Sequence, residues 1–130
     1  MDQQATLEGL SLRERSEFFR GLLLVMAADG ELHDAERELI KHAISPFDFS
    51  AEFVDESIES IESILKNKHV SQVPPHFESQ ANSHLFLRAA LDIAFADGVL
   101  DETEEKWLRA TADLNGIAAE WLEEQIAERE

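Results

Sequence analysis

An internal repeat constrains the fold of this chain more than any other feature of its sequence. A shift of 68 positions aligns residues 18–43 with residues 86–111 without a gap. Of the 26 aligned pairs 8 are identical, where average residue frequencies would give about one or two. The identical pairs are Phe18/Phe86, Arg20/Arg88, Leu23/Leu91, Ala28/Ala96, Asp29/Asp97, Gly30/Gly98, Leu32/Leu100 and Glu36/Glu104. This duplication predicts two similar units that share one core and pack about a pseudo-two-fold axis.

Each copy has the pattern of a helix-turn-helix hairpin. In the first copy Phe18, Leu22 and Val25 recur at the spacing of one helix face. Gly30 and Gly98 can each end such a helix, because glycine adopts the left-handed conformation without a steric cost. Both copies then continue as Ala-Asp-Gly-x-Leu-x-[Asp/Glu]-x-Glu into a second amphipathic helix. We therefore predict two hairpins, centred on Asp29-Gly30 and Asp97-Gly98.

Capping residues and prolines place the other helices. Ser11 and Glu14 match a capping box that starts the first helix. The later helices are expected over about 34–43, from 51 onward, about 77–96 with an interruption allowed near Asn82-Ser83, about 102–114 and about 118–128. The segment from about 66 to 76 contains Pro74-Pro75 and reads as a linker between repeat halves of about 11–66 and 77–128. The sequence thus predicts an all-α fold over residues 1–130, a single-domain helical bundle of about six or seven helices.

The charge of the chain narrows the classes of partner. With 28 acidic and 11 basic residues the formal net charge is -17, which repels phosphate backbones and anionic lipid. We therefore expect neither nucleic acid nor a membrane as a partner, whereas cations and basic protein surfaces are attracted. The outer face of the helix after Ser50 is almost wholly acidic, which usually means a solvated face and less often a surface for a basic partner. The acids of that face are Glu52, Asp55, Glu56, Glu59 and Glu62.

The sequence lacks the motifs of several kinds of functional site and targeting segment. The chain has no cysteine, and no histidine pair has the spacing of a zinc site. Nucleotide-binding and serine-hydrolase motifs are absent, so we expect no catalytic residues and no enzyme. We expect His69, His76 and His84 to be solvated, and Trp107 and Trp121 to pack in the core with their indole N–H groups bonded at its edge. No signal peptide and no membrane span are recognisable, which predicts a cytoplasmic protein.

The repeated carboxylates are the candidate functional groups. Asp29 and Glu36 stand as far apart as positions 5 and 12 of an EF-hand loop, and Asp97 and Glu104 repeat this spacing. Positions 1 and 3 are apolar in both copies, so neither loop alone can supply the 6–8 oxygen ligands that calcium takes. The apolar residues at these positions are Val25 and Ala27 in the first copy and Ile93 and Phe95 in the second. Neither copy is therefore an EF-hand.

Two interpretations of these acids stay open. In the structural one, Asp101 and Glu104 form a capping box, and Glu36 plays the same part behind a weaker N-cap at His33. In the functional one, both copies bring their acids together, or each copy is completed by backbone carbonyls, and a hard divalent ion such as Ca²⁺ or Mg²⁺ relieves the repulsion. The metal ligands would then be Asp29, Glu36, Asp97 and Glu104.

The doubled motif resembles the TerB-like family associated with tellurite resistance. The matching stretches are residues 26–40 and 94–108, followed by residues 112–117, and the likeness extends from about Ser16 to Ile126. The resemblance implies an all-helical fold and a cytoplasmic, bacterial setting linked to stress responses. It also implies that the turn acids, here Asp29, Glu36, Asp97 and Glu104, form a metal-chelating centre. Related domains are fused to J-domain co-chaperones, which implies an interaction module.

Taken together, these patterns predict a non-enzymatic, acidic TerB-like domain, associated with stress or tellurite resistance, that binds a divalent cation through its Asp-Gly turns. The alternative is a protein–protein interaction module whose carboxylates are purely structural and whose partner has a basic surface. The sequence identifies neither the partner nor the oligomeric state.

Overall fold

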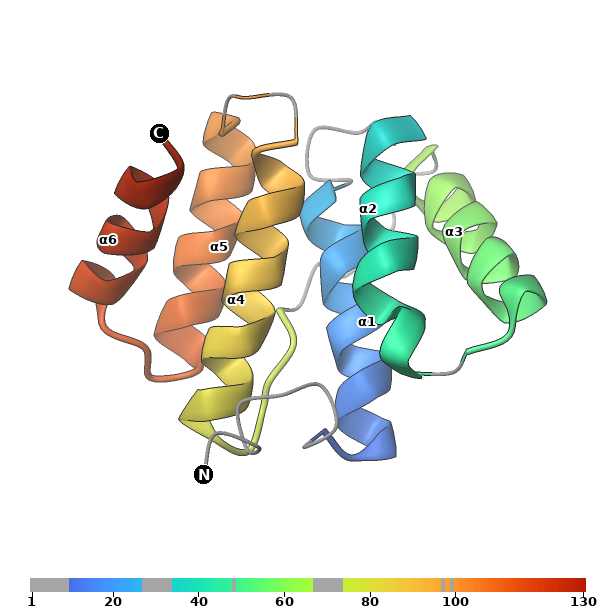
Figure 1. Ribbon diagram of the computed structural model, residues 1–130, viewed down its shortest axis with the longest axis horizontal. Helices are drawn as coiled ribbons and strands as arrows, with labels where there is room; N and C mark the ends of the chain where they lie inside the picture. Colours follow the sequence, from blue (N-terminus) through green and yellow to red (C-terminus); the bar gives the residue numbers. More distant parts are fainter. Residues whose placement is uncertain (1–9, 27–33, 48, 67–73, 97, 99) are drawn as a thin grey trace.

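Six α-helices and one short 3₁₀ helix make up the regular structure of the described residues. The computed structural model describes residues 10–26, 34–47, 49–66, 74–96, 98 and 100–130. Its elements are α1 (Leu12–Met26), α2 (Asp34–Ile44), η4 (Ser45–Phe47), α3 (Ala51–Lys66), α4 (Gln80–Ala94), α5 (Glu102–Leu114) and α6 (Ala119–Arg129) (Figure 1). The predicted all-α class is therefore confirmed. None of these helices is long and apolar enough to span a membrane.

The helices are arranged as a central group of four with one further helix on each side. Helices α1, α2, α4 and α5 form the centre, α3 lies outside α1, and α6 lies outside α4 and α5 (Figure 1). α1 and α4 run in the same direction, and α2 and α5 return beside them. The end of α1 and the start of α2 therefore lie at the same end of the molecule as the end of α4 and the start of α5 (Figure 1).

The offset of 68 residues holds for every α-helix. α4 begins 68 residues after α1, α5 begins 68 residues after α2, and α6 begins 68 residues after α3. The sequence agrees, because identical pairs continue beyond the hairpins at the same offset. These further pairs are Ser11/Ser79, Ala51/Ala119, Glu52/Glu120, Glu56/Glu124, Ile58/Ile126 and Glu62/Glu130. The repeated unit is thus three helices long, one more than the predicted hairpin, while the pseudo-two-fold symmetry itself stays a prediction.

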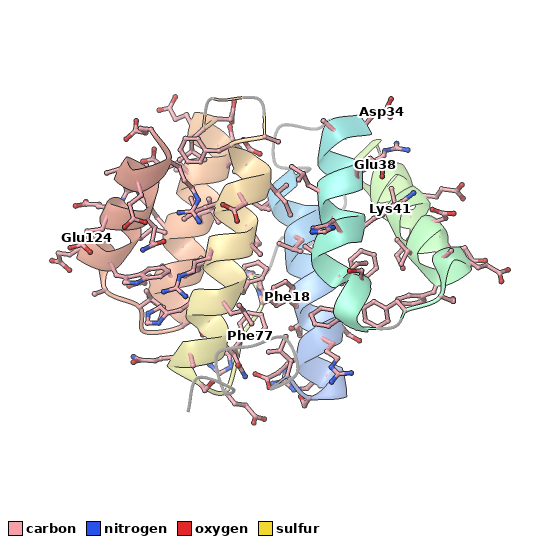
Figure 2. All side chains as sticks on the ribbon, in the orientation of Figure 1. Phe18, Asp34, Glu38, Lys41, Phe77 and Glu124 are labelled. Atoms are coloured by element: carbon pink, nitrogen blue, oxygen red, sulfur yellow. The ribbon has the colours of Figure 1, made fainter. Side chains whose placement is uncertain are left out.

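Repeat-related side chains meet at the boundary between α1 and α4. The rings of Phe18 and Phe86 are both fully buried and lie edge to face, with centroids 5.3 Å apart. One turn earlier, the buried Asn82 amide donates to the buried Glu14 carboxylate at 3.4 Å across the same 68-residue separation. Phe77 also packs against both rings, and Figure 2 shows Phe18 and Phe77 at the centre of the bundle. One cluster of buried apolar residues accordingly reaches all six α-helices.

The start of α4 differs from the prediction. The helix begins at Gln80, after Ser79, whose hydroxyl oxygen accepts the N–H of Asn82 at 3.1 Å. The expected start at Phe77 and the interruption allowed near Asn82-Ser83 were both wrong. Asn82 and Ser83 are buried in the first turn, where polar side chains find partners at a helix N-terminus that they would lack in the middle of a helix.

Asn115 fastens the segment before α4 to the end of α5. Its side-chain oxygen accepts the N–H of Phe77 at 2.9 Å and the hydroxyl of Ser83 at 3.3 Å. Its amide nitrogen donates to the carbonyls of Pro75 and Thr111, both at 2.9 Å. Gly116 follows with φ +69 and closes α5, whose end at Leu114 agrees with the predicted range of about 102–114.

Candidate functional site

Only one of the four predicted metal ligands has a described side chain. Asp29 and Asp97 lie outside the described residues, and for Glu36 only its backbone place in the first turn of α2 is described. Glu104 is described in full and is buried, with 4% of its surface exposed. Within the described part of the chain, no group of three or more histidines and acids is close enough to hold a metal ion. The meeting of the four acids stays a prediction.

Glu104 takes part in the predicted capping box of α5. Its Oε1 accepts the backbone N–H of Asp101 at 3.3 Å, and the Asp101 carboxylate accepts the N–H of Thr103 at 2.8 Å. These bonds satisfy N–H groups that have no partner within the helix, and the two carboxylates lie at its positive end. Capping therefore accounts for part of the role of Glu104.

In the second copy the described residue of the Asp-Gly pair is Gly98. Gly98 has φ +91, and its N–H donates to the carbonyl of Phe95 at 2.8 Å. The left-handed conformation predicted for Gly98 is thus present, but α4 ends at Ala94 with Phe95 as its C-cap, so Gly98 does not itself end the helix as predicted. The described helix ends that flank the two motifs, the end of α1 with the start of α2 and the end of α4 with the start of α5, lie at one end of the molecule (Figure 1). The fold therefore allows a site shared by the two copies.

Glu14 is a buried charged residue whose contacts with Glu78 and Asn82 were not predicted from the sequence. It is 3% exposed, and its Oε2 accepts the backbone N–H of Glu78 at 3.0 Å. It completes the predicted capping box with Ser11, whose hydroxyl oxygen accepts the N–H of Glu14 at 3.2 Å. Extending the repeat toward the N-terminus pairs Glu14 with Asn82, and this was the available sign of their contact. Glu14 thus holds the start of α1 against the start of α4.

Burial and hydrogen bonding act on Glu14 in opposite directions. Burial disfavours the charged carboxylate and would by itself raise its pKa. The N–H groups of Glu78 and Ser11, the Asn82 amide and the charge of Arg13 outweigh burial and leave the pKa of Glu14 below its ordinary value of 4.5. The carboxylate is therefore charged at neutral pH.

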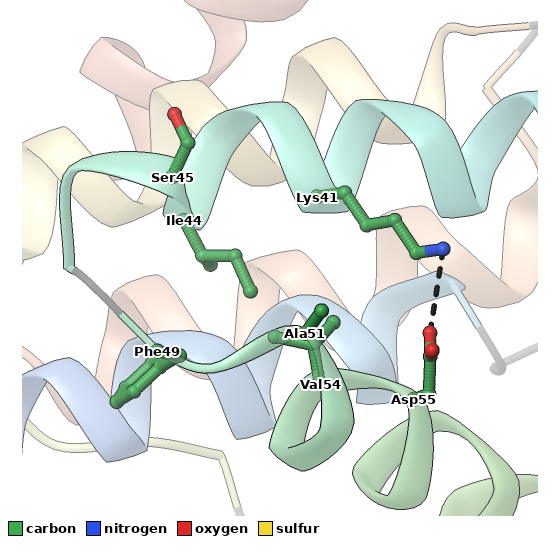
Figure 3. A pocket seen from close by; sticks show the side chains of 7 residues that line it. All are labelled: Lys41, Ile44, Ser45, Phe49, Ala51, Val54 and Asp55. Atoms are coloured by element: carbon green, nitrogen blue, oxygen red, sulfur yellow. Dashed lines mark ion pairs between the residues drawn. The ribbon is translucent and has the colours of Figure 1, made fainter.

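The outer helix α3 carries an exposed acidic face beside apolar cavities. Glu52, Asp55, Glu56 and Glu59 are all exposed, as predicted, and the side chain of Glu62 lies outside the described set. A cavity of about 390 Å³ opens between α2 and α3 (Figure 3). Its lining is mainly apolar, and an ion pair of 3.4 Å between Lys41 Nζ and Asp55 Oδ1 spans one end. This arrangement suits the binding of an apolar group more than the binding of an ion.

Two side chains of the second repeat unit have environments that differ from the predicted ones. His84 is half-buried and stacks on Trp121 with ring centroids 4.3 Å apart, so the expectation that it is solvated was wrong. Trp107 is in the core at 7% exposure, as predicted, but its indole N–H is buried and has no hydrogen-bond partner among the described residues. The expected bond at the core edge is therefore wrong for Trp107.

These features define a small all-helical domain of two related three-helix units, each with an Asp-Gly pair in its sequence and acids at the start of the following helix. A family model described as tellurite resistance protein TerB matches residues 15–125. The chain therefore belongs to the TerB family, and the matched range agrees with the predicted likeness from about Ser16 to Ile126. Neither a curated protein nor a solved structure showed significant similarity to the chain.

Proposed function

We propose that this TerB domain is non-enzymatic and binds a divalent cation, Ca²⁺ or Mg²⁺, through Asp29, Glu36, Asp97 and Glu104. The observation that supports the proposal is that the described helix ends flanking the two acidic motifs lie at one end of the bundle (Figure 1). Carboxylate oxygens are the ligands that these hard ions prefer. A cation held between the two turns would tie the two repeat units together. We place this activity in the cytoplasm of a bacterium under stress, as the family resemblance implies.

Electrostatics gives the physical reason for such a site. Four acids gathered at one end of a chain with a net charge of -17 repel one another, and repulsion of this kind costs stability. A bound divalent ion removes that cost, so the folded state should be more stable with the ion than without it.

The test is thermal unfolding of the EDTA-treated chain with and without millimolar CaCl₂ or MgCl₂. At a concentration of 100 times Kd, binding adds about 2.7 kcal/mol, which raises Tm by about 10 °C in a chain of this size. Asp97→Asn should abolish the rise, whereas Glu102→Gln, an exposed acid of the same helix start, should keep it. A Tm that neither ion moves would exclude the cation function.

The second candidate is a protein-interaction module with structural carboxylates only, and the capping box of Glu104 favours it. In that case Glu104→Gln lowers stability by about 1 kcal/mol, the usual worth of a cap, and does so equally in EDTA and in CaCl₂. Under the cation proposal the same substitution costs more in CaCl₂ than in EDTA.

A further inference from the structure

The two repeat units fill the space beside their outer helices in different ways. In the second unit Trp121 of α6 stacks on His84 of α4, and the guanidinium of Arg88 lies over the same indole at 5.7 Å. The residues of the first unit at the offset of 68 are Phe53, Ser16 and Arg20. A smaller ring and a serine thus stand where the second unit has an indole and an imidazole.

A groove lies where these smaller residues stand. It runs between α1 and α3 and has a volume of about 440 Å³. Ser16, Arg20 and Leu23 line it on the α1 side, and Phe53, Ser57 and Ser60 line it on the α3 side, with Phe19 between them. We call this feature the α1–α3 groove.

The form of the α1–α3 groove suits a helix. On each wall the first and last lining residues are seven positions apart, 16 to 23 and 53 to 60, so the groove follows both helices for about 10 Å, or two turns. The serine side chains on both walls are small, so the backbone of a bound helix can approach α1 and α3 closely. An amphipathic helix places apolar side chains in such a groove at helical spacing.

Apolar side chains form the floor and one edge of the groove. Phe19 and Leu23 are buried, each at 3% exposure, and Phe53 at the edge is 45% exposed. The Phe53 ring is held by Phe49 and Phe19, with centroids 5.1 Å and 6.0 Å away. A partner side chain therefore meets a positioned aromatic edge whose outer face is open to stacking.

The charges on the walls of the groove determine which kind of partner can bind there. Glu56 lines the wall, and Glu52, Asp55 and Glu59 stand exposed on the same helix. The cation that lines the groove, Arg20, already pairs with Glu17 at 2.7 Å. A second copy of this chain would bring another charge of -17 to the surface, so self-association is opposed. A positively charged partner is favoured.

We propose that the α1–α3 groove binds a basic amphipathic helix of another protein. The apolar face of that helix would cover Phe19, Leu23 and Phe53, and its lysines and arginines would face Glu52, Glu56 and Glu59. An arginine could stack on Phe53, as Arg88 lies over Trp121 in the other unit. This inference does not depend on the cation site, which involves other residues.

The test is fluorescence anisotropy of the full chain with a dye-labelled 14-residue peptide of lysine and leucine in amphipathic order. A peptide of the same composition in scrambled order is the control for net charge. The ordered peptide should bind at least about tenfold more tightly, because only its apolar face fits the groove. Backbone amide shifts in NMR spectra should change along α1 and α3.

Matched variants distinguish the groove from a general attraction between charges. Phe53→Ala should weaken binding of the ordered peptide by about tenfold, whereas Leu114→Ala, which is 49% exposed at the end of α5, should leave it within about twofold. Glu56→Gln should weaken binding and reduce its salt dependence, whereas Glu124→Gln, the repeat-related acid that points outward from α6 (Figure 2), should do neither.

A final variant closes the groove without removing apolar surface. Ser16→His combined with Phe53→Trp transfers the stacked pair of the second unit into the first, and should abolish binding while Tm stays the same or rises. The proposal is overturned if both peptides bind equally, if Glu124→Gln acts like Glu56→Gln, or if the closed variant folds and still binds. Dimerisation of the chain that Phe53→Ala prevents, measured by sedimentation, would also overturn it.

Discussion

Replacing Glu14 by glutamine should destabilise the domain by about 2 kcal/mol, although the two side chains have nearly the same size. The buried carboxylate accepts the N–H of Glu78 at 3.0 Å and the Asn82 amide at 3.4 Å. A glutamine offers one oxygen and one NH₂ group, so one of these donors would face another donor. A donor left unsatisfied in the interior costs about 1–3 kcal/mol.

The loss is measurable by thermal or urea unfolding at neutral pH. With an unfolding entropy of about 2 cal/mol/K per residue, 2 kcal/mol lowers Tm of a chain of this length by about 7 °C. The control is Glu17→Gln on the same helix, which removes the half-buried ion pair with Arg20 and should cost at most about 0.5 kcal/mol.

The pH dependence of this difference gives a sharper test. Because the pKa of Glu14 is lower in the folded state than its ordinary value of 4.5, its contribution is complete above that value and is lost as pH falls through the folded pKa. The stability difference between the natural chain and Glu14→Gln should therefore be largest near pH 7 and shrink below about 4.5. A difference that stays constant down to pH 3, or stays below about 0.5 kcal/mol at pH 7, would refute the role given to the charged carboxylate.

Three further substitutions test other contacts by urea unfolding. Gly21→Val should lower the free energy of unfolding by about 3 kcal/mol, because a Cβ there would lie 2.6 Å from the buried Phe86 ring. The control, Ala89→Val at the repeat-related site, should cost under about 1 kcal/mol. Equal costs at the two sites would contradict the proposed crowding at Gly21. Asn115→Ala should cost about 2–3 kcal/mol by removing four hydrogen bonds; a cost under about 0.5 kcal/mol would show that they contribute little. Burial and the charge of Arg88 lower the pKa of His84 below 6.5, so the natural chain should lose more stability than His84→Gln as pH falls below that value, and parallel curves would contradict this.

The helix starts were largely predictable, because local residues decide them. Ser11 with Glu14 and Asp101 with Glu104 marked α1 and α5, and both capping boxes are present in the structure. The start of α4 was missed because Ser79 is followed at the third position by Asn82, which departs from the Glu or Gln of a capping box. A serine N-cap that lacks the matching Glu or Gln is a weak signal of a helix start in the sequence. It is nevertheless sufficient to begin the helix once α1 packs beside it.

The exposure of individual apolar side chains between helices could not be predicted in the same way. Leu39 of α2 is 37% exposed and lines a cavity of about 310 Å³ between α2 and α4. Its repeat-related residue Trp107 is 7% exposed. Helical spacing identifies the apolar face of each helix, but the distance to the neighbouring helix decides whether a leucine fills the space that a tryptophan fills.

The helical class and the offset of 68 residues follow from the sequence alone, because residue spacing and caps act locally. Only the packing of the helices reveals that Glu14 is buried against Asn82. It also reveals that a groove is open beside Phe53, whereas in the second unit His84 stacks on Trp121. Such contacts depend on how closely separate helices approach one another. That distance is set by all the side chains packed between them at once, and no single segment encodes it.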